Sequence, residues 1–228
     1  MTTFYNSKTH AMTIEKSDIP ALPWESFVRM PGIGVGLTNT AGDLLFLNDE
    51  EMRLFEGRTD VDYHGKNLRD FYNQEFVQER LKLIRQVTET RRPLVITHIL
   101  NGRRIQSTIW PISDSEPPHD RVLVVSRQVR GGKDGIQSDF DKYESEYIDL
   151  GRLDVLSPRE LEVMVLLGHG QSIPDVAKIL HRSQKTIEKH RESIGRKLSL
   201  RSQSEIVRIV WDAGLEISDI SKQRLKQG

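Results

Sequence analysis

Cysteine is absent from this chain of 228 residues. Its absence excludes disulfide bonds, zinc–thiolate sites and catalysis by a thiol. Uninterrupted apolar runs are also short, far below the roughly 20 residues that a membrane-spanning helix needs. The first residues contain neither the basic nor the apolar region of a signal peptide. We therefore expect a cytoplasmic protein that does not have a membrane as a partner.

Net charge is lacking as well, because 33 Lys and Arg balance 33 Asp and Glu. The charges are nevertheless unevenly placed. Residues 131–155 carry 3 basic and 7 acidic side chains, whereas residues 156–228 carry 13 basic and 9 acidic ones. Within residues 182–201 the basic side chains outnumber the acidic ones by 7 to 2. Such a concentration is typical of a nucleic-acid-binding face, although an ordinary solvated basic patch would give the same count.

Motifs of enzymes are missing too. The sequence contains no metal-ligand cluster, nucleophile elbow or Walker loop. Gly32, Gly34 and Gly36 have the wrong spacing for a phosphate-binding loop and lead into a predicted strand rather than a helix. Glu160 and Glu162 are explained by helix capping and exposure. We expect no enzymatic activity.

What the sequence does contain is a succession of helix-start signals within Leu156–Glu205. The first helix opens with the cap Ser157, with Pro158 at the first helical position and with Glu160 three residues after the cap. Three further serine caps predict the later helices: Ser172, Ser183 and Ser202. The spacing predicts a bundle of four short helices over residues 156–214.

The third of these helices is predicted to run from Ser183 to about Leu198. Ile187 and Ile194 lie on its apolar stripe, together with Leu198. Because successive residues are about 100° apart on a helix, a polar set faces the other way. This set consists of Lys185, Lys189, Glu192 and Arg196, with Glu188 on the flank. A helix that is apolar behind and cationic in front suits the major groove of DNA.

The run LSPRELEVMVLLGHGQSIPDVAKILHRSQKTIEKHRESIGRKLSLRSQSE resembles the LuxR-type (FixJ/NarL-type) helix-turn-helix domain. The resemblance rests on the Ser-Pro-Arg-Glu opening, Ala177, Lys185-Thr186-Ile187, His190 and the closing Arg196-Lys197-Leu198. It implies an all-α four-helix domain that binds double-stranded DNA as a homodimer, with its third helix in the major groove.

Carried over by position, the resemblance implies that Glu188, Lys189 and Glu192 read base edges. Residues implied to contact the DNA backbone are Arg182, Lys185, Thr186, Arg196, Lys197 and Arg201. A carboxylate can accept a hydrogen bond from cytosine. The two glutamates also have ion-pair spacing to arginines of the same helix, so a purely stabilising role is the alternative. Ser199 departs from the usual glycine, and we expect the turn there to use another conformation.

Residues 21–130 are predicted to contain strands as well as helices. Ile33–Thr38 and Leu44–Leu47 are predicted to form a hairpin, and Asn48 is predicted to cap a short helix that ends at Gly57. A longer amphipathic helix is expected around Gln74–Thr90. Three predicted strands follow, Leu94–Leu100, Arg103–Ile112 and Val122–Val129, with a hairpin turn at Asn101-Gly102.

This element order, and the opening GIGVGLTNTAGDLLFLNDEEMRLF, resemble PAS sensor domains. The resemblance implies a five-stranded antiparallel sheet with flanking helices, a cavity between them, and frequent dimerisation. No cofactor is predicted, although an unidentified ligand remains open. Cysteinyl-flavin chemistry is excluded by the lack of cysteine, and haem is not expected because the long helix has no histidine. Phe46, His98 and Trp110 are candidate pocket residues, with packing in the core as the alternative.

Between the two segments, Phe140, Tyr143, Tyr147 and Leu150 have heptad-like spacing after a glycine-rich break. They predict a short amphipathic helix that pairs with a second chain or packs on the sensor domain of the same chain. In either arrangement this segment is the best candidate for carrying a signal from the sensor domain to the DNA-binding domain.

The sequence thus predicts an α+β protein that is a DNA-binding transcriptional regulator. The alternative is a signalling adaptor that uses both domains for protein contacts. RNA polymerase or a signalling protein is kept as a further partner. The predicted parts are a flexible N-terminal lead (1–20), a PAS-like sensor or dimerisation domain (21–130), a linker (131–155), the helix-turn-helix domain (156–214) and a C-terminal tail (215–228).

Overall fold

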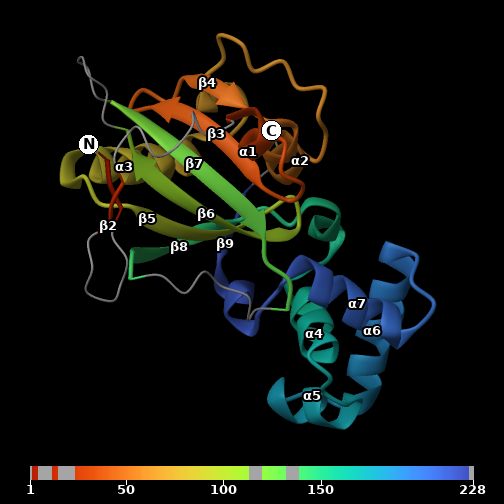
Figure 1. The fold of residues 1–228 in the computed structure, drawn as a ribbon. Coiled ribbons are helices and arrows are strands. Elements are labelled where there is room, and N and C mark those ends of the chain that lie inside the picture. Colours follow the sequence, from red (N-terminus) through yellow and green to blue (C-terminus); the bar gives the residue numbers. More distant parts are fainter. Residues whose placement is uncertain (1, 5–11, 15–23, 113–119, 132–138, 226–228) are drawn as a thin grey trace.

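The computed structural model describes residues 2–4, 12–14, 24–112, 120–131 and 139–225. A sheet with helices against it forms the larger body, and a group of helices lies beyond one end of this sheet (Figure 1). The strands are β1 (Thr2–Phe4), β2 (Met12–Ile14), β3 (Gly34–Asn39), β4 (Leu44–Leu47), β5 (Leu94–Leu100), β6 (Arg103–Pro111), β7 (Arg121–Gln128), β8 (Asp141–Ile148) and β9 (Gln223–Arg224). The helices are α1 (Trp24–Val28), α2 (Asp49–Glu56), α3 (Gln74–Thr90), α4 (Pro158–Gly168), α5 (Ile173–Ile179), α6 (Gln184–Leu198) and α7 (Gln203–Ala213), with three 3-10 turns, η1 (Leu68–Asp70), η2 (Gly151–Val155) and η3 (Ile217–Ser221).

The main sheet has the order β4-β3-β7-β6-β5-β8-β9. Its first five strands pair antiparallel, which confirms the PAS-like sheet predicted from the sequence. The predicted count of five strands is too low, because β8 adds to β5 in parallel and β9 adds to β8 in parallel. Both extra strands lie outside the predicted sensor domain, one before and one after the helical bundle.

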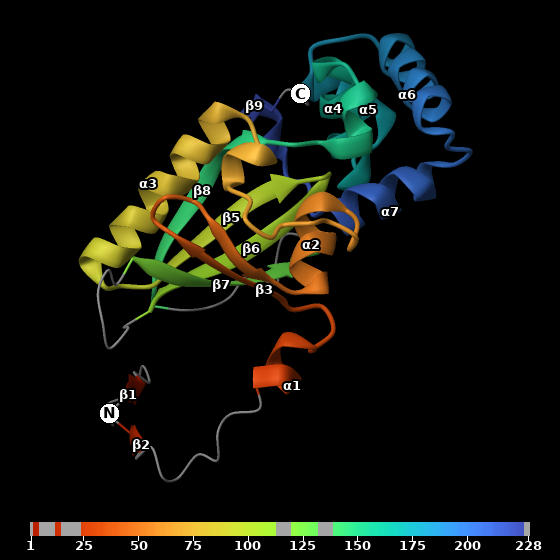
Figure 2. The same ribbon diagram turned by 90° about the horizontal axis from the view of Figure 1, so that it is seen from above.

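Helices α2 and α3 cover the same face of this sheet, since residues of both helices line one cavity with β3 to β7. Figure 2 shows α3 running along the sheet and the bundle α4 to α7 at the sheet's far end. Asn48 starts α2 as predicted, and its Oδ1 accepts hydrogen bonds from the amides of Glu51 and Val35, at 2.8 and 2.9 Å. This asparagine therefore fixes the helix to the neighbouring strand.

The predicted linker helix is wrong, because residues 141–148 form strand β8. A spacing of four, as between Tyr143 and Tyr147, places residues on one side of a helix but also on one face of a strand. Glu79 of α3 decides between them. Its carboxylate accepts hydrogen bonds from the Tyr143 hydroxyl (3.0 Å), the Ser145 hydroxyl (2.8 Å) and the amide of Glu146 (3.1 Å). The segment thus packs on the sensor domain of its own chain.

The four helices of the C-terminal bundle begin at the predicted caps. Ser157 with Glu160 and Ser202 with Glu205 form reciprocal capping boxes. Ser172 and Ser183 cap α5 and α6. The expectation for Ser199 is wrong: it ends α6 in the left-handed conformation, with φ of 56°, that glycine would adopt there.

One apolar cluster joins the bundle to the sheet. It contains Ile99 and Ile148 of the sheet together with buried side chains of α4, α6 and α7. The segment predicted as a tail continues this contact, since Leu215 is buried and β9 pairs with β8. Arg104 of β6 forms a buried ion pair with Asp219 of η3. The sensor and helical domains are therefore packed against each other.

Two of the predicted parts, the N-terminal lead and the linker, are only partly described by the structure. Residues 2–4 and 12–14 of the N-terminal lead pair as an antiparallel hairpin, and the rest of that lead lies outside the described residues. The glycine-rich break in the linker lies outside them as well, apart from Gly131 with φ of 61°. Within the described ranges, no helix combines the length and the apolar character that crossing a membrane requires.

Candidate DNA-binding face and sensor cavity

The outward face of α6 carries the predicted DNA-reading residues. Ile187 and Ile194 are fully buried against the bundle and fix the rotation of the helix. As a consequence, Lys185, Glu188, Lys189, Glu192 and Arg196 are all exposed on one side, and Arg182 and Arg201 are exposed before and after the helix. We call these seven residues the α6 face.

The two glutamates of this face are not held by cations. No ion pair joins Glu188 or Glu192 to another residue in the part of the chain that the structure covers. The helix-stabilising alternative for these side chains therefore has no support in the geometry. Their carboxylates remain available to accept hydrogen bonds.

Two residues predicted to contact the DNA backbone also bond to other residues of the domain. The Lys197 ammonium donates to Glu160 Oε2 (2.6 Å) and to the carbonyl of Val155 (3.1 Å). Thr186 is half-buried, and its hydroxyl bonds that of the cap Ser183 (2.8 Å). We therefore leave Lys197 and Thr186 out of the α6 face.

Glu160 joins α4 to α6 and makes the bundle sensitive to acid. Burial raises its pKa, but hydrogen bonds from Lys197, Ser193 and Ser157 outweigh burial and hold the pKa at about 2. Because the folded-state pKa is depressed, the stabilisation is present above the ordinary value of 4.5 and is lost as the pH falls towards 2.

Replacing Glu160 with glutamine should remove this acid sensitivity. After a discount for solvent screening at the partly exposed Lys197, we expect Glu160→Gln to lower the free energy of unfolding at pH 7 by about 2 kcal/mol. The difference from the wild type should shrink between pH 4.5 and 2. Urea unfolding at several pH values measures it. Glu162→Gln is the matched control, and an equal effect of both variants would contradict the assignment.

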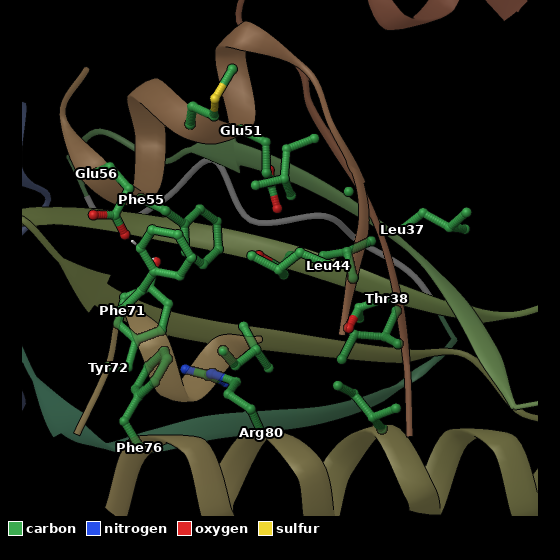
Figure 3. Close-up of a pocket in the computed structure, with 18 of the residues that line it drawn as sticks. Leu37, Thr38, Leu44, Glu51, Phe55, Glu56, Phe71, Tyr72, Phe76 and Arg80 are labelled. Carbon is green, nitrogen blue, oxygen red and sulfur yellow. Dashed lines mark hydrogen bonds between the residues drawn. The ribbon is translucent and has the colours of Figure 1, made fainter. Parts of the chain in front are cut away.

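The second candidate site is a cavity of about 90 Å³ between α2, α3 and the sheet. Most of its lining is apolar, from residues such as Leu44, Met52 and Phe55. Its polar members come from both helices and from the sheet. They are Thr38, Glu51, Glu56, Tyr72 and Arg80, which Figure 3 labels, together with His98 and Ser107.

A chain of buried polar side chains runs along the sheet from α3 to α2. Arg80 Nη2 lies 2.7 Å from His98 Nδ1, and His98 Nε2 lies 3.4 Å from the Ser107 hydroxyl. This hydroxyl lies 2.8 Å from that of Ser126, which is 3.1 Å from Glu51 Oε1. All five residues are buried, each less than 7% exposed. We call this set the polar chain.

Burial sets the charges of the polar chain. It raises the pKa of Glu51 to about 8, so this carboxyl is protonated at neutral pH. Burial, with the nearby Arg80 cation, lowers the pKa of His98 well below its usual value, so the imidazole is neutral. Burial also lowers the pKa of Arg80 to about 10, which leaves the guanidinium charged. Arg80 is therefore the one charged member of the set.

Of the three predicted pocket residues, only His98 lines the cavity. Trp110 is wrong because it follows Ile109, which faces the cavity, and successive strand residues point to opposite faces. Its ring meets Phe140 edge-on at 4.9 Å. Phe46 is wrong as well, since it packs against Trp24 with ring centroids 5.9 Å apart.

Sequence reasoning missed Glu51 and Arg80. Both lie at helical spacing within an apolar stripe, Glu51 four residues before Phe55, and Arg80 midway between Phe76 and Ile84. A charged residue on the inward stripe of an amphipathic helix is the signal that would have found them. The serines carry no comparable sequence signal, because only the register places Ser107 opposite Ser126.

Gly34 makes room for the Glu51 carboxyl, which gives a prediction. A Cβ on Gly34 would overlap Glu51 Oε2. We therefore expect Gly34→Ala to lower the free energy of unfolding by about 1–3 kcal/mol through overpacking. Thermal unfolding of the variant measures the cost. In a Glu51→Ala background the same change should cost less, although the added Cβ would still lie 3.0 Å from Leu54 Cδ1 and 3.1 Å from the Cα of residue 51. An unchanged cost there would show that the carboxyl is not the obstacle.

A capped four-helix bundle that exposes a cationic third helix defines a helix-turn-helix DNA-binding domain. Residues 154–210 match the family model described as bacterial regulatory proteins of the luxR family. This part of the chain, about a quarter of its length, is thus a LuxR-type helix-turn-helix domain.

Curated relatives resemble the chain over a limited stretch. The transcriptional regulatory protein TdiR of Thauera aromatica is 35% identical over 85 residues, which cover 37% of either chain. The transcriptional regulatory protein MctR of Rhizobium johnstonii is 29% identical over 97 residues, 42% of this chain and 45% of the relative. The chain thus matches less than half the length of these two relatives.

Among solved structures, a Vibrio cholerae VqmA–ligand–DNA complex is similar with a TM-score of 0.44 and 16% identity, over 88% of this chain and 91% of that chain. A PAS domain from a two-component sensor histidine kinase is similar with a TM-score of 0.34 and 14% identity, over 46% and 93%.

Proposed function

We propose that the chain is a transcriptional regulator that binds DNA as a homodimer through α6, under the control of its PAS-like domain. The observation that carries this proposal is the α6 face, displayed by a domain of the LuxR type. In this role Lys189, Glu188 and Glu192 read base edges in the major groove, and the arginines and Lys185 bind phosphates. RNA polymerase or a signalling protein is a further partner in this proposal.

We propose that strand β8 transmits a structural change from the cavity to the DNA-binding domain. It is bonded to Glu79, which neighbours the cavity residue Arg80, and it leads directly into η2 and α4. Strand β9, which follows the bundle, pairs with the same strand. A ligand that moved α3 would therefore act on both the chain entering the DNA-binding domain and the chain leaving it.

The test is selection of bound sequences from random double-stranded DNA by the full chain, followed by titration at several salt concentrations. We expect an inverted repeat with half-sites about one helical turn apart, and affinity that falls steeply with salt as counterions are released. A chain that selects no sequence and shows no salt dependence would refute the proposal. That result would favour the adaptor, which uses both domains for protein contacts.

A further inference from the structure

A polar cleft of about 840 Å³ lies where the sensor sheet meets the helical bundle. It shares no lining residue with the cavity between α2, α3 and the sheet. Its walls come from α2, the β5–β6 turn, the end of β7, η2 and α7. In Figure 2, α7 lies beside α2 at this end of the sheet, and α6 is on the side of the bundle away from the sheet. The volume falls within the range of roughly 300–1,000 Å³ that is typical of sites for drug-sized ligands.

Positive charge is in excess in this cleft. Four arginines line it, together with two acidic residues. Each acidic residue has one of the arginines beside it. Glu50 forms an ion pair with Arg53 on α2, and Asp212 Oδ1 of α7 lies 4.0 Å from Arg130 Nε. The acidic residues thus compensate two of the four arginines, and two positive charges remain.

The remaining charges belong to Arg103 and Arg152, which have no acidic partner in the described part of the chain. The backbone brings these two residues together. Each of them follows a glycine with positive φ, Gly102 at 66° and Gly151 at 50°. A Cβ on Gly102 would lie 2.8 Å from the carbonyl oxygen of Leu150, so the two turns touch through their backbones. The two guanidinium groups therefore leave adjacent turns and line the same cleft.

A phosphomonoester matches this pair of arginines. A guanidinium group binds phosphate or carboxylate through paired N–H donors in a fixed fork. A phosphomonoester has a charge of about −1.5 to −2 at pH 7 and three strong acceptor oxygens on one phosphorus atom. One such group can therefore accept from both arginines and balance both charges. A single carboxylate has one charge and would leave one arginine uncompensated.

The rest of the lining favours an organic body on this phosphate. Leu54 of α2, Leu153 of η2 and Ile209 of α7 add apolar surface to the cleft. Free phosphate would leave that surface and most of the volume unfilled. Phosphates within a DNA strand are diesters with one charge each, and the α6 face that we propose for DNA is formed by other residues. The cleft thus suits a small phosphorylated molecule better than DNA.

We propose that the cleft between the sensor sheet and the bundle binds the phosphomonoester group of a small organic molecule through Arg103 and Arg152. Arg103 begins β6 of the sensor sheet, and Arg152 lies in η2, which leads into α4. A phosphate held by both arginines therefore links the sensor domain to the chain that enters the DNA-binding domain. This site is additional to the sensor cavity and does not depend on the proposed DNA binding.

Three benzene derivatives of similar size test which charge the cleft selects: phenyl phosphate has about two negative charges, benzenesulfonate has one and benzyl alcohol has none. NMR titration of the full chain gives the dissociation constants and shows which amides shift. We expect phenyl phosphate to bind about tenfold more tightly than benzenesulfonate, since a charge-assisted contact at a partly exposed arginine is worth about one factor of ten. Benzyl alcohol should bind most weakly. Equal affinities for phosphate and sulfonate, no binding of phenyl phosphate, or shifts confined to the α6 face would overturn the inference.

Variants of the two arginines locate the site. Arg103→Gln and Arg152→Gln should each weaken the binding of phenyl phosphate about tenfold and remove its advantage over benzenesulfonate. Both variants should fold, because neither arginine has an acidic partner within the described residues. Arg85→Gln on the exposed side of α3 is the matched control for loss of a positive charge and should leave the dissociation constant unchanged. Full affinity in both cleft variants, or an equal loss in Arg85→Gln, would refute the assignment.

Two competitors identify the source of the phosphate. Inorganic phosphate should bind more weakly than phenyl phosphate, because it leaves the apolar part of the lining bare. Equal binding of the two would overturn the inference of an organic ligand. Double-stranded DNA of unselected sequence should leave the shift of the Arg103 amide by phenyl phosphate unchanged. Displacement of phenyl phosphate by this DNA would assign the cleft to the DNA-binding surface and overturn the proposed small-molecule site.

Discussion

Replacing Arg104 with alanine is expected to lower the free energy of unfolding by about 3–5 kcal/mol and to loosen the DNA-binding domain from the sensor domain. Arg104 Nε donates to the carbonyl of Gly214 at 2.7 Å, and its guanidinium forms the ion pair with Asp219. The side chains are 7% and 1% exposed. Removal of the arginine would leave the Asp219 carboxylate buried with Lys222, whose side chain is 12% exposed, as its remaining cation at 2.9 Å.

Urea unfolding followed by circular dichroism measures this cost, and limited proteolysis of the native protein reports the loosening between domains. Arg103→Ala is the matched control, because this neighbour on the same strand is only partly buried and contacts no acidic partner within the described chain. We expect it to change stability by less than about 0.5 kcal/mol. The Arg104→Ala, Asp219→Ala double variant should be less destabilised than the sum of the single changes. Similar losses for Arg103 and Arg104 would rule out the interdomain ion pair as the cause.

The second large effect is expected at the α6 face. Lys189→Ala should weaken binding to the selected DNA site by about 1–3 kcal/mol, or roughly tenfold to a hundredfold, and should relax the preference at one base pair. Lys185→Ala, one helical turn earlier, should weaken binding to all sequences alike and reduce the salt slope by about one. Both residues are exposed, so neither change should affect folding.

Competition titrations with the selected site and with single-base variants of it separate the two effects. Lys142→Ala on β8 is a control for simple loss of positive charge, because this exposed lysine lies in the sensor sheet. If Lys189→Ala bound the selected site as tightly as the wild type, the assignment of Lys189 as a base reader would be withdrawn. If Lys142→Ala weakened binding equally, the effect would be one of net charge.

Local sequence signals were sufficient for most of the elements. The serine caps of the bundle fix where its helices begin, because each cap satisfies amide donors of its own first turn. The hairpin between β5 and β6 follows from Asn101-Gly102, which adopt φ of 50° and 66°. The α6 face was predictable as well, since a helix with a clear apolar stripe has only one remaining side.

Predictions failed where a contact between distant residues decided the outcome. The segment around Tyr143 satisfies the period of a helix and of a strand, and the carboxylate of Glu79, more than sixty residues earlier, selects the strand. Lys197, which the sequence predicts to contact the DNA backbone, also bonds Glu160 of another helix, and no local signal indicates that contact. Ser199 adopts the left-handed conformation because the bundle requires α6 to end there, whatever the residue's own preference.

The sequence by itself determined the caps, the turns, the apolar stripes and the LuxR-type face, because each depends on residues within one or two helical turns of each other. Only the tertiary structure decided the polar chain, the added strands β8 and β9 and the ion pair of Arg104 with Asp219. Those features join residues from separate elements, and the burial that sets their protonation exists only after the elements have packed.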